Sequence, residues 1–575
     1  MFQYSDHHRR LTDPASSVDE KVKVASELKE NIEIVLTGEY SSFLSTFFRP
    51  FCDILRTVPP QFADTPEHKL RNNVVDILTR LPQNEALRSH IVELYDVCLN
   101  VVQTDNQDNG LPAIKLLLDL QKGFRTFLEG QGSLLAQFLM KCFANLSSTV
   151  SEVLDPGPEG GEPPYAKVPS QAIPGFKSFK VLAEQPFVVM YLMNAYERLR
   201  PVVLPQLVPL IIRAACLPGP ALSDPHVRGP LAQHYADFRL VQVRCLQYLL
   251  WLLRNAYTAQ QAAAAAAADG RHSASAAAAA SLAFPIEPHV PAIAEALVHL
   301  LRQCPDVVTT RKELMIVTRH MLQTAVRTHL PAHMDELMDE RALCGAGRAC
   351  TETLRHGACG LLAEIVHNCR RQLRPHQLAR ATHLFASITY DASLPTSTRA
   401  TCLRAMCVLV DPILQQAKAA AAQQAAAAAA GGAGAGSAAA DPEGLKAQGR
   451  RLLGRILESL VAALKHLRMQ GSRMIAEARS EREVLDRQRA AMCSPSGAAA
   501  ALGPDDMLSS VTIPGEKERE VVESRNMLQG LLPHMKHLAY ALAKYNSVVQ
   551  QQQQQQQQLG GGAAAGGAGG LSEEE

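Results

Sequence analysis

Two histidines, His329 and His333, stand four residues apart in the stretch THLPAHMDELMDE, and Glu336 and Asp339 follow them. On a continuous helix this spacing places two imidazoles on one face, as in a zinc site. Pro331 lies between the two histidines, however, and a proline inside a helix removes a hydrogen bond and clashes with the preceding turn. The glutamate of the H-E-x-x-H pattern is also missing. We therefore predict a helix boundary at this proline and no metal site.

The glycines of GAGRAC, residues 345–350, are a second candidate, because glycine-rich loops bind phosphate groups. The segment follows no predicted strand and lacks the third glycine of a dinucleotide-binding loop. The sequence also contains no phosphate loop, nucleophile elbow or protein-kinase signature. We interpret the glycines as a helix end, followed by a helix that begins at Thr351 or Thr353. No catalytic, cofactor-binding or metal-binding residue is predicted, so an enzyme is the least favoured class.

The composition indicates a large helical protein. The 575 residues are 47% hydrophobic but only 5% aromatic, with a single tryptophan, which suits helices better than sheets. The formal net charge of +1 provides no field that would recruit nucleic acid or acidic lipid. The 13 cysteines form no C-x-x-C pair, which indicates reduced thiols in an intracellular compartment, many of them buried as small apolar residues. The N-terminal residues contain no apolar segment typical of a signal peptide.

Apolar residues recur with the helical period along most of the chain. From Phe238 the stripe is Phe238, Val241, Cys245, Tyr248, Leu249 and Leu252. Such stretches come in pairs of about 15–20 residues each, repeated at a spacing of roughly 40, which predicts an all-α fold of the HEAT/armadillo type: an α-solenoid of paired antiparallel helices. An irregular all-helical globule would show the same local pattern without the stacking order.

The segment FKVLAEQPFVVMYLMNAYERLRPVVLPQLVPLII, residues 179–212, is one of the most apolar parts of the chain. A membrane-spanning helix needs about 20 apolar residues. Here Glu197, Arg198 and Arg200 separate two shorter runs, and the second run contains three prolines. The segment is therefore predicted to be one buried helical pair and not a membrane hairpin.

Low-complexity tracts interrupt the helical array. We predict a disordered N-terminus at 1–16, helical repeats at 17–154, 176–259 and 285–416, basic amphipathic helices at 442–492 and a terminal helix at 516–548. Between and after them we place a Pro/Gly loop at 155–175, an Ala-rich insertion at 260–284, an Ala/Gly-rich insertion at 417–441, a linker at 493–515 and a poly-Gln and Gly/Ala tail at 549–575. The tracts are interpreted as insertions at loop positions, where extra chain length costs little free energy.

Segment 442–492 is a candidate partner-binding helix. Its predicted apolar face consists of Leu453, Ile456, Leu457, Leu460, Leu464 and Leu467. Its basic residues are Arg450, Arg451, Arg455, Lys465, Arg468 and Arg473. Such a helix either binds acidic partners or is an ordinary solenoid helix with a solvated basic face, and the second case is the commoner one. A second basic face is predicted at Arg311–Arg327. Which residues bind a partner stays open.

Seven segments carry more information than periodicity does, because the order of their residues is specific. They are EYSSFLSTFFRPF (39–51), RLPQNEALR (80–88), FKVLAEQPFVV with LVPLII (179–189 and 207–212), HYADFRLVQVRCL (234–246), LLRQCPDVVTTRKELMIVTRHML (300–322), MDELMDERALCGAGRACTETLR (334–355) and DASLPTSTRATCLRAMCVLVD (391–411). In this order they resemble the N-terminal HEAT-repeat region of the transformation/transcription domain-associated protein (TRRAP) family, the pseudokinase scaffolds among the phosphatidylinositol-3-kinase-related kinases.

The resemblance implies a HEAT-type α-solenoid without kinase activity, since the family's kinase-like domain has lost its catalytic residues. Family members belong to nuclear histone acetyltransferase complexes of the SAGA and NuA4 types and present surfaces to transcription activators. We therefore expect a non-catalytic scaffold in the nucleus, with acetyltransferase-complex subunits and activators as protein partners. No cofactor, membrane, small-molecule substrate or direct contact with nucleic acid is expected.

The chain differs from the family in length, because the FAT region and the pseudokinase are not in this sequence, and we expect a fragment or a short form. Two alternatives keep the solenoid and change its role. One is a helical-repeat transport or trafficking adaptor, which would carry a ladder of Trp and Asn residues; a chain with one tryptophan supports it poorly. The other is the N-terminal arm of an active kinase of the related family.

Overall fold

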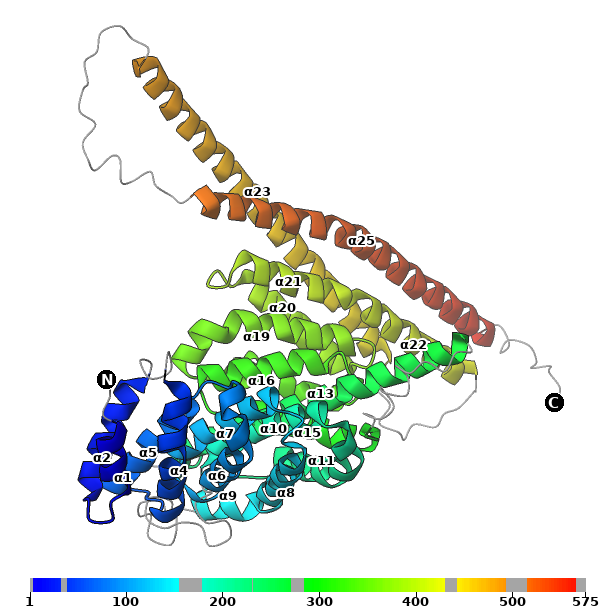
Figure 1. The fold of residues 1–575 in the computed structure, drawn as a ribbon. Coiled ribbons are helices and arrows are strands. Elements are labelled where there is room, and N and C mark those ends of the chain that lie inside the picture. The colour runs from blue at the N-terminus through cyan, green and yellow to red at the C-terminus, as the bar shows by residue number, and fades with distance from the viewer. Residues whose placement is uncertain are drawn as a thin grey trace, which may run out of the picture. The chain divides into compact units, whose positions relative to one another are not determined.

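The computed structural model describes residues 4–32, 39–154, 178–229, 231–269, 284–429, 442–492 and 514–564. Within these ranges every regular element is a helix and none is a strand (Figure 1). The predicted all-α fold is therefore confirmed. The chain forms two units, Met1–His329 and Leu330–Glu575, each with its own stack of helices.

The first unit is built from two rows of helices, and each helix contacts the next one in its row. The first row is α4 (Tyr40–Thr57), α6 (Ile91–Thr104), α8 (Glu129–Ala144), α11 (Arg200–Cys216) and α15 (Val290–Gln303). The second row is α2 (Val18–Glu30), α5 (Pro66–Thr79), α7 (Gln107–Gly123), α10 (Phe179–Ala195), α13 (Ala232–Asp269) and α16 (Val308–Met321). Stacking of pair upon pair is what separates a solenoid from an irregular globule, so the predicted architecture is confirmed.

Shorter elements precede or connect the helices of these rows. They are α1 (Tyr4–Thr12), α9 (Leu146–Leu154), α12 (Pro225–Arg228) and the 3₁₀ turns η1 (Glu85–His90), η3 (Glu197–Leu199), η4 (Glu287–His289) and η5 (Ala325–Thr328).

The second unit repeats the same plan. It begins with the short elements η6 (Leu330–His333), α17 (Met334–Leu337) and α18 (Glu340–Cys344). Its longer helices are α19 (Arg348–Cys369), α20 (Pro375–Tyr390), α21 (Thr396–Val408), α22 (Val410–Ala429), α23 (Pro442–Met492) and α25 (Pro514–Ala564). Helix α19 contacts α21, which contacts α25, while α20 and α22 both contact α23. Because α23 also contacts α25, the end of this unit is a layer in which α20, α21, α23 and α25 come together.

Helix α5 shows how local sequence sets a repeat helix. The Thr65 side chain accepts a hydrogen bond from the His68 backbone N–H, and Pro66 occupies the first turn, where its missing N–H costs nothing. The apolar residues that follow at helical spacing are all buried: Leu70, Val74, Val75, Ile77 and Leu78. Capping starts the helix, and burial between neighbouring repeats stabilises it.

Buried polar side chains cap the first helix of several pairs. The Arg71 guanidinium donates to the carbonyl oxygen of Leu55, in the last turn of α4, at 2.8 Å and forms an ion pair with Asp105 at 2.6 Å. In a later pair, Gln242 Nε2 donates to the carbonyl oxygens of Ala214, Ala215 and Leu217 at the end of α11. These contacts satisfy carbonyl groups that a helix end leaves without an intrahelical partner.

The N-terminus corrects one prediction. Residues 1–16 are predicted to be disordered, yet Tyr4–Thr12 form helix α1. The Tyr4 ring lies edge-on to Phe47, with 5.7 Å between ring centroids, and Leu11 is buried. Tyr4, His8 and Leu11 share one helical face, so a short stripe inside a polar segment is enough to dock it.

The low-complexity tracts correct a second prediction, because three of them extend helices beyond the predicted boundaries. Helix α13 continues to Asp269, α22 continues to Ala429, and α25 continues through the glutamines to Ala564. Alanine and glutamine have high helix propensity, so these tracts prolong a helix that packing has already started. The rest of the predicted insertions, the Pro/Gly loop at 155–175 and most of the linker at 493–515 lie outside the described residues.

The apolar segment 179–212 forms α10, η3 and α11. One stretch of it, Glu197–Cys216, is long and apolar enough to pass for a membrane span, which corrects the prediction that both runs are too short. The charged residues counted as a break lie inside this stretch, and Arg200 is buried with its Nε donating to the Met193 carbonyl oxygen. Half of the stretch is buried, and α11 packs against α8, α13 and α15. Its packing is that of a core helix.

Candidate partner-binding surface

The predicted histidine pair lies at a break between 3₁₀ turns. His329 follows η5, and His333 is the last residue of η6, so the helix boundary predicted at Pro331 is confirmed. His333 faces Glu336, with 3.9 Å between Nδ1 and Oε1. Among the residues that the structure describes, no group of three or more His, Cys, Asp or Glu side chains is placed to hold a metal ion.

The glycines of GAGRAC lie at a helix end, as predicted. Helix α18 ends at Cys344, and Gly345 has a φ of 90°, a conformation that a residue with a side chain rarely adopts. Helix α19 then begins at Arg348, which is earlier than the predicted start at Thr351 or Thr353. The glycines therefore shape a turn.

Most cysteines are core residues. Eleven of the twelve cysteines in the described part of the chain are buried, and only Cys216 is exposed. Burial raises the pKa of the Cys52, Cys402 and Cys407 thiols to about 12, because an apolar environment disfavours the thiolate. Such thiols stay protonated near neutral pH and are poor nucleophiles.

The basic face predicted at Arg311–Arg327 is wrong at its first residue. The Arg311 side chain is only 3% exposed and lies 3.2 Å from Asp306. Its Nη2 donates to the carbonyl oxygen of Cys304 and its Nε to that of Pro305, directly after α15. Arg319 and Arg327 are exposed. Arg311 is thus another internal cap, and two exposed arginines remain of the predicted face.

Helix α23 differs, because its basic residues do face solvent. Arg450, Arg451, Lys465, Arg468 and Arg473 are exposed, and Arg455 is half-buried. Of the predicted apolar face, Leu453, Ile456, Leu460 and Leu467 are buried and Leu464 is half-buried, whereas Leu457 is 39% exposed. The segment 444–476 contains seven Lys and Arg residues and one acidic residue, Glu458, so this part of α23 has a strong positive charge.

Four bases share one edge of α23. They are Arg451, Arg455, His466 and Arg473, at intervals of 4, 11 and 7 residues, which a helix of 3.6 residues per turn places almost in line. Ala462 and Met469 lie on the same line. We call these four residues the basic edge. Arg450 and Arg468 lie on the other side of the same helix.

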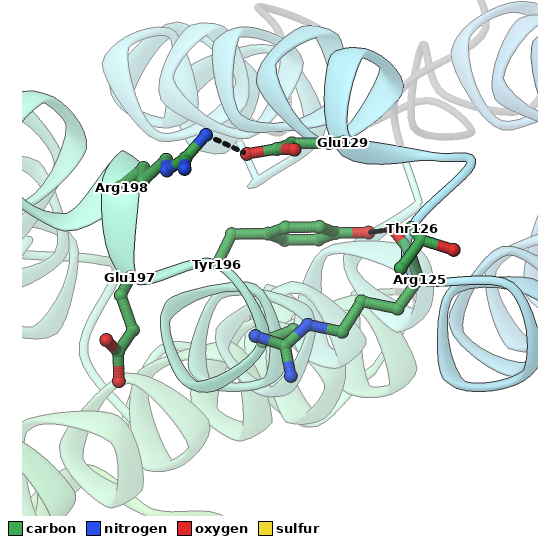
Figure 2. Close-up of a pocket in the computed structure, with 7 residues that line it drawn as sticks. Arg125, Thr126, Glu129, Tyr196, Glu197 and Arg198 are labelled. Carbon is green, nitrogen blue, oxygen red and sulfur yellow. Dashed lines mark hydrogen bonds and ion pairs between the residues drawn. The ribbon is translucent and has the colours of Figure 1, made fainter.

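A pocket of about 280 Å³ in the first unit is polar and balanced in charge. Figure 2 shows Tyr196 at its centre, with Arg198 and Glu129 facing one another across it at 3.7 Å. Tyr196 Oη donates to the Arg125 carbonyl oxygen at 3.2 Å, and burial raises the pKa of this tyrosine to about 12. The two arginines are matched by two glutamates, Glu129 and Glu197. The tyrosine stays protonated near neutral pH, so its phenol is a poor nucleophile.

A second pocket, of about 240 Å³, lies in the second unit beside the basic edge. Its lining comes from four helices and the turn after α20: Thr389, Tyr390, Ala392, Thr396, Arg399, Ala462, Ala463, His466 and Met527. The floor is apolar, with alanines and a methionine, and Tyr390 is 49% exposed. Arg399 and His466 place basic groups in the same lining. We call this site the Tyr390 pocket.

Arg399, which lines the Tyr390 pocket, and Arg455, which lies over the Tyr390 ring, each have a donor without an acceptor. The Nε atoms of Arg399 and Arg455 are shielded from solvent and make no hydrogen bond. Arg455 lies over the Tyr390 ring at 5.9 Å, and its Nη1 reaches Glu458 at 3.4 Å. A buried N–H without a partner costs free energy, and an acceptor that binds either guanidinium after a rotation of the side chain would offset that cost. Tyr390, Arg399 and Met527 are distant in sequence and carry no motif, which is why sequence patterns missed them.

Comparison with known proteins identifies relatives of the chain. Residues 279–562 match the family described as the Tra1 HEAT repeat central region. The chain is 27% identical over 445 residues to the transformation/transcription domain-associated protein of Homo sapiens, which covers 73% of this chain. It is 24% identical over 542 residues to the "Probable transcription-associated protein 1" of Dictyostelium discoideum, covering 80%. It is 23% identical over 466 residues to the SAGA complex/NuA4 acetyltransferase complex subunit TRA1 of Saccharomyces cerevisiae, covering 71%.

The matches cover only a small part of each relative. They span 10%, 11% and 12% of the Dictyostelium, human and yeast proteins, respectively. The matched family region is described as central, whereas the sequence resemblance predicts an N-terminal region. The predicted resemblance to this family is confirmed, and the part of the family that residues 279–562 match is the one described as central.

Proposed function

Since the chain belongs to the Tra1/TRRAP family, we propose that it is a non-catalytic scaffold in a SAGA- or NuA4-type histone acetyltransferase complex. In that role it binds complex subunits and transcription activators in the nucleus and so contributes to recruitment of the acetyltransferase. The observation that carries the proposal is the similarity to proteins named as SAGA and NuA4 subunits, which extends over more than two thirds of this chain.

The solenoid supports a binding role. Stacked helix pairs bury their inner faces against one another and leave long rows of outer side chains exposed, which suits the binding of extended partners. In the second unit the exposed row on α23 is basic, and an apolar pocket lies beside it. A transport adaptor or the arm of an active kinase would use the same architecture, but the names of the relatives favour transcription over either one.

The non-catalytic part of the proposal is supported by the chemistry of the pockets. The polar pocket around Tyr196 has balanced charges and a protonated phenol. The Tyr390 pocket contains a histidine, but no carboxylate, cysteine or serine lines it. Acid–base or covalent catalysis needs a nucleophile, a base and a group that orients the base. Binding is the role that these pockets suit.

The direct test is co-purification. The full 575-residue chain, carrying an affinity tag, is expressed in its own cells and recovered from nuclear extract. We expect recovery of acetyltransferase-complex subunits by mass spectrometry, together with acetylation of histone substrates by the precipitate. An unrelated helical-repeat protein of similar size with the same tag controls for non-specific binding. Recovery of kinase or transport partners without acetyltransferase subunits would contradict the proposal.

A further inference from the structure

We propose that the Tyr390 pocket and the basic edge of α23 together bind a short amphipathic helix from a partner protein. One bulky apolar side chain of the partner enters the pocket, and carboxylates beside it lie along the basic edge. The inference rests on the proposed function and deepens it, because it names the chemistry of a partner segment and the residues that hold it.

The pocket suits a single apolar side chain. Its volume of about 240 Å³ is lined by three alanines, Met527 and the ring of Tyr390. Apolar surface that is removed from water on both partners provides the driving force, and an aromatic ring at the rim adds contact area at a low cost in conformational entropy. The lining combines helix ends with the middle of α23, so the pocket is open beside a continuous helix and not enclosed within a core.

The positive charge around the pocket favours a partner segment with negative charge. Arg455 and His466 lie on the same edge of α23 as the lining residue Ala462, and Arg399 faces the pocket from α21. The Nε donors of Arg399 and Arg455 have no acceptor. A carboxylate is the acceptor that a guanidinium binds best, because two oxygens match its planar donors.

The length of the edge indicates a helix as the partner. From Arg451 to Arg473 the edge spans 22 residues, roughly 33 Å at the rise of an α-helix. A partner helix of about four turns covers two thirds of that distance, with acidic residues three or four apart facing successive bases. The pocket lies near the middle of the edge, at Ala462 and His466, so one apolar anchor is flanked by charges on both sides.

Nucleic acid is the competing occupant of a basic surface, and the pocket argues against it. Phosphate binding needs only exposed Lys and Arg residues and gains nothing from an apolar cavity. The exposed bases of α23 are also distributed around the helix, whereas the pocket and the donors without acceptors lie on one edge. A duplex would use Arg450 and Arg468 as readily as Arg451 and Arg473, and this difference makes the two occupants separable.

The test uses fluorescence anisotropy with the full chain and a labelled 16-residue peptide. The peptide places Phe and Leu at positions i, i+4 and i+7 of a helix and Asp and Glu on the flanks of that stripe. We expect saturable binding that weakens with salt, and a scrambled peptide of identical composition that binds about tenfold more weakly. Equal binding of the two peptides would overturn the proposal.

Matched variants locate the site. The double variant Arg451→Glu/Arg473→Glu reverses two exposed charges on the basic edge and is expected to weaken peptide binding about tenfold or more. Arg450→Glu/Arg468→Glu makes the same change in net charge on the other side of the helix and is expected to change binding by less than about twofold. If both double variants weaken binding equally, binding depends only on the net charge of the helix, which contradicts a site at the edge.

Two further variants test the pocket without changing charge. Ala392→Trp fills it from an exposed position, and Tyr390→Ala removes its exposed aromatic wall. Each is expected to weaken binding about fivefold or more while the salt dependence stays the same. If both variants bind the peptide as the unmodified chain does, the pocket does not take part in binding and the proposal is wrong. A DNA duplex that displaces the peptide, and that binds the Tyr390→Ala variant normally, would instead make this a nucleic-acid surface.

The outcome stays distinct from that of the proposed function. A chain that still co-purifies with acetyltransferase subunits but does not bind the peptide refutes the docking site alone. A chain that binds the peptide through the edge but recovers no such subunits refutes the proposed complex and keeps the site.

Discussion

Helices α16 and α23 resemble each other in sequence and differ in what their arginines do. Both show bases next to an apolar stripe. In α16 the Arg311 side chain is 3% exposed and donates to carbonyl oxygens just after α15. In segment 444–476 of α23, five Lys and Arg side chains with described burial are exposed. Arginine therefore has two roles in this solenoid. Inside a helix pair it caps a helix end, and on the outside it forms a charged surface.

The two roles differ because the guanidinium groups have different neighbours. The end of a helix leaves carbonyl oxygens without intrahelical partners and carries a partial negative charge. A second helix that packs against that end can supply an arginine whose donors match these oxygens. On α23, by contrast, Arg451 and Arg473 are exposed, and Arg455 lies over the ring of Tyr390 at the end of α20 with its Nε atom lacking an acceptor.

The largest expected effect is loss of the most buried arginine. Arg71 and Asp105 are 1% and 0% exposed and lie 2.6 Å apart. Arg71→Met leaves the Asp105 carboxylate buried without its partner, and we expect a loss of about 3–5 kcal/mol in the free energy of unfolding. Urea unfolding of the full chain, followed by circular dichroism, measures it. Arg56→Met, which breaks an exposed pair with Glu93, is the control and should cost less than about 1 kcal/mol.

A smaller effect is expected at Arg311. Arg311→Met removes charged hydrogen bonds to the Cys304 and Pro305 carbonyl oxygens, and its partner Asp306 is 36% exposed and can turn to water. We expect a loss of about 2 kcal/mol, measured by the same urea titration. A loss below that of Arg56→Met would show that Arg311 is a surface residue after all and would break the comparison with α23.

The ion pair between the half-buried Arg355 and Asp391 should contribute less to the free energy of unfolding than Arg311 does, and its contribution should depend on pH. Arg355 lies 2.7 Å from Asp391, and hydrogen bonds from Ser393, together with this arginine, lower the pKa of the Asp391 carboxyl. A carboxylate with a lowered pKa in the folded state stabilises the fold at pH values above its unfolded pKa of about 4, and the contribution disappears as pH falls through the folded pKa. Asp391→Asn should therefore cost up to about 1 kcal/mol at pH 7 and progressively less below pH 4. Thermal unfolding across that range measures the difference, and a gap that widens in acid would contradict the assignment.

Sequence predicts the helices of this protein better than it predicts which side chains meet. Periodicity predicts the apolar stripe of α23 correctly except at Leu457, which is exposed. The period shows which face of a helix is apolar, but it does not show how much of that face a neighbouring helix covers. Periodicity also counts every arginine as a surface residue, and so it misplaces Arg311. The Tyr390 pocket is beyond any local pattern, since Tyr390, Arg399, Ala462 and Met527 come from four helices that only packing brings together.

The smallest expected effect on stability belongs to the basic edge. Arg451 and Arg473 are exposed, and Arg473 contacts the exposed Glu477, one helical turn away, at 3.4 Å. Arg451→Glu/Arg473→Glu should change the free energy of unfolding by less than about 0.5 kcal/mol per site, because exposed charges are solvated in both states. Urea unfolding at low and high salt measures it. If this double variant costs as much as Arg311→Met, the bases of α23 are structural. A small cost, combined with loss of peptide binding, would separate the two roles of arginine within one fold.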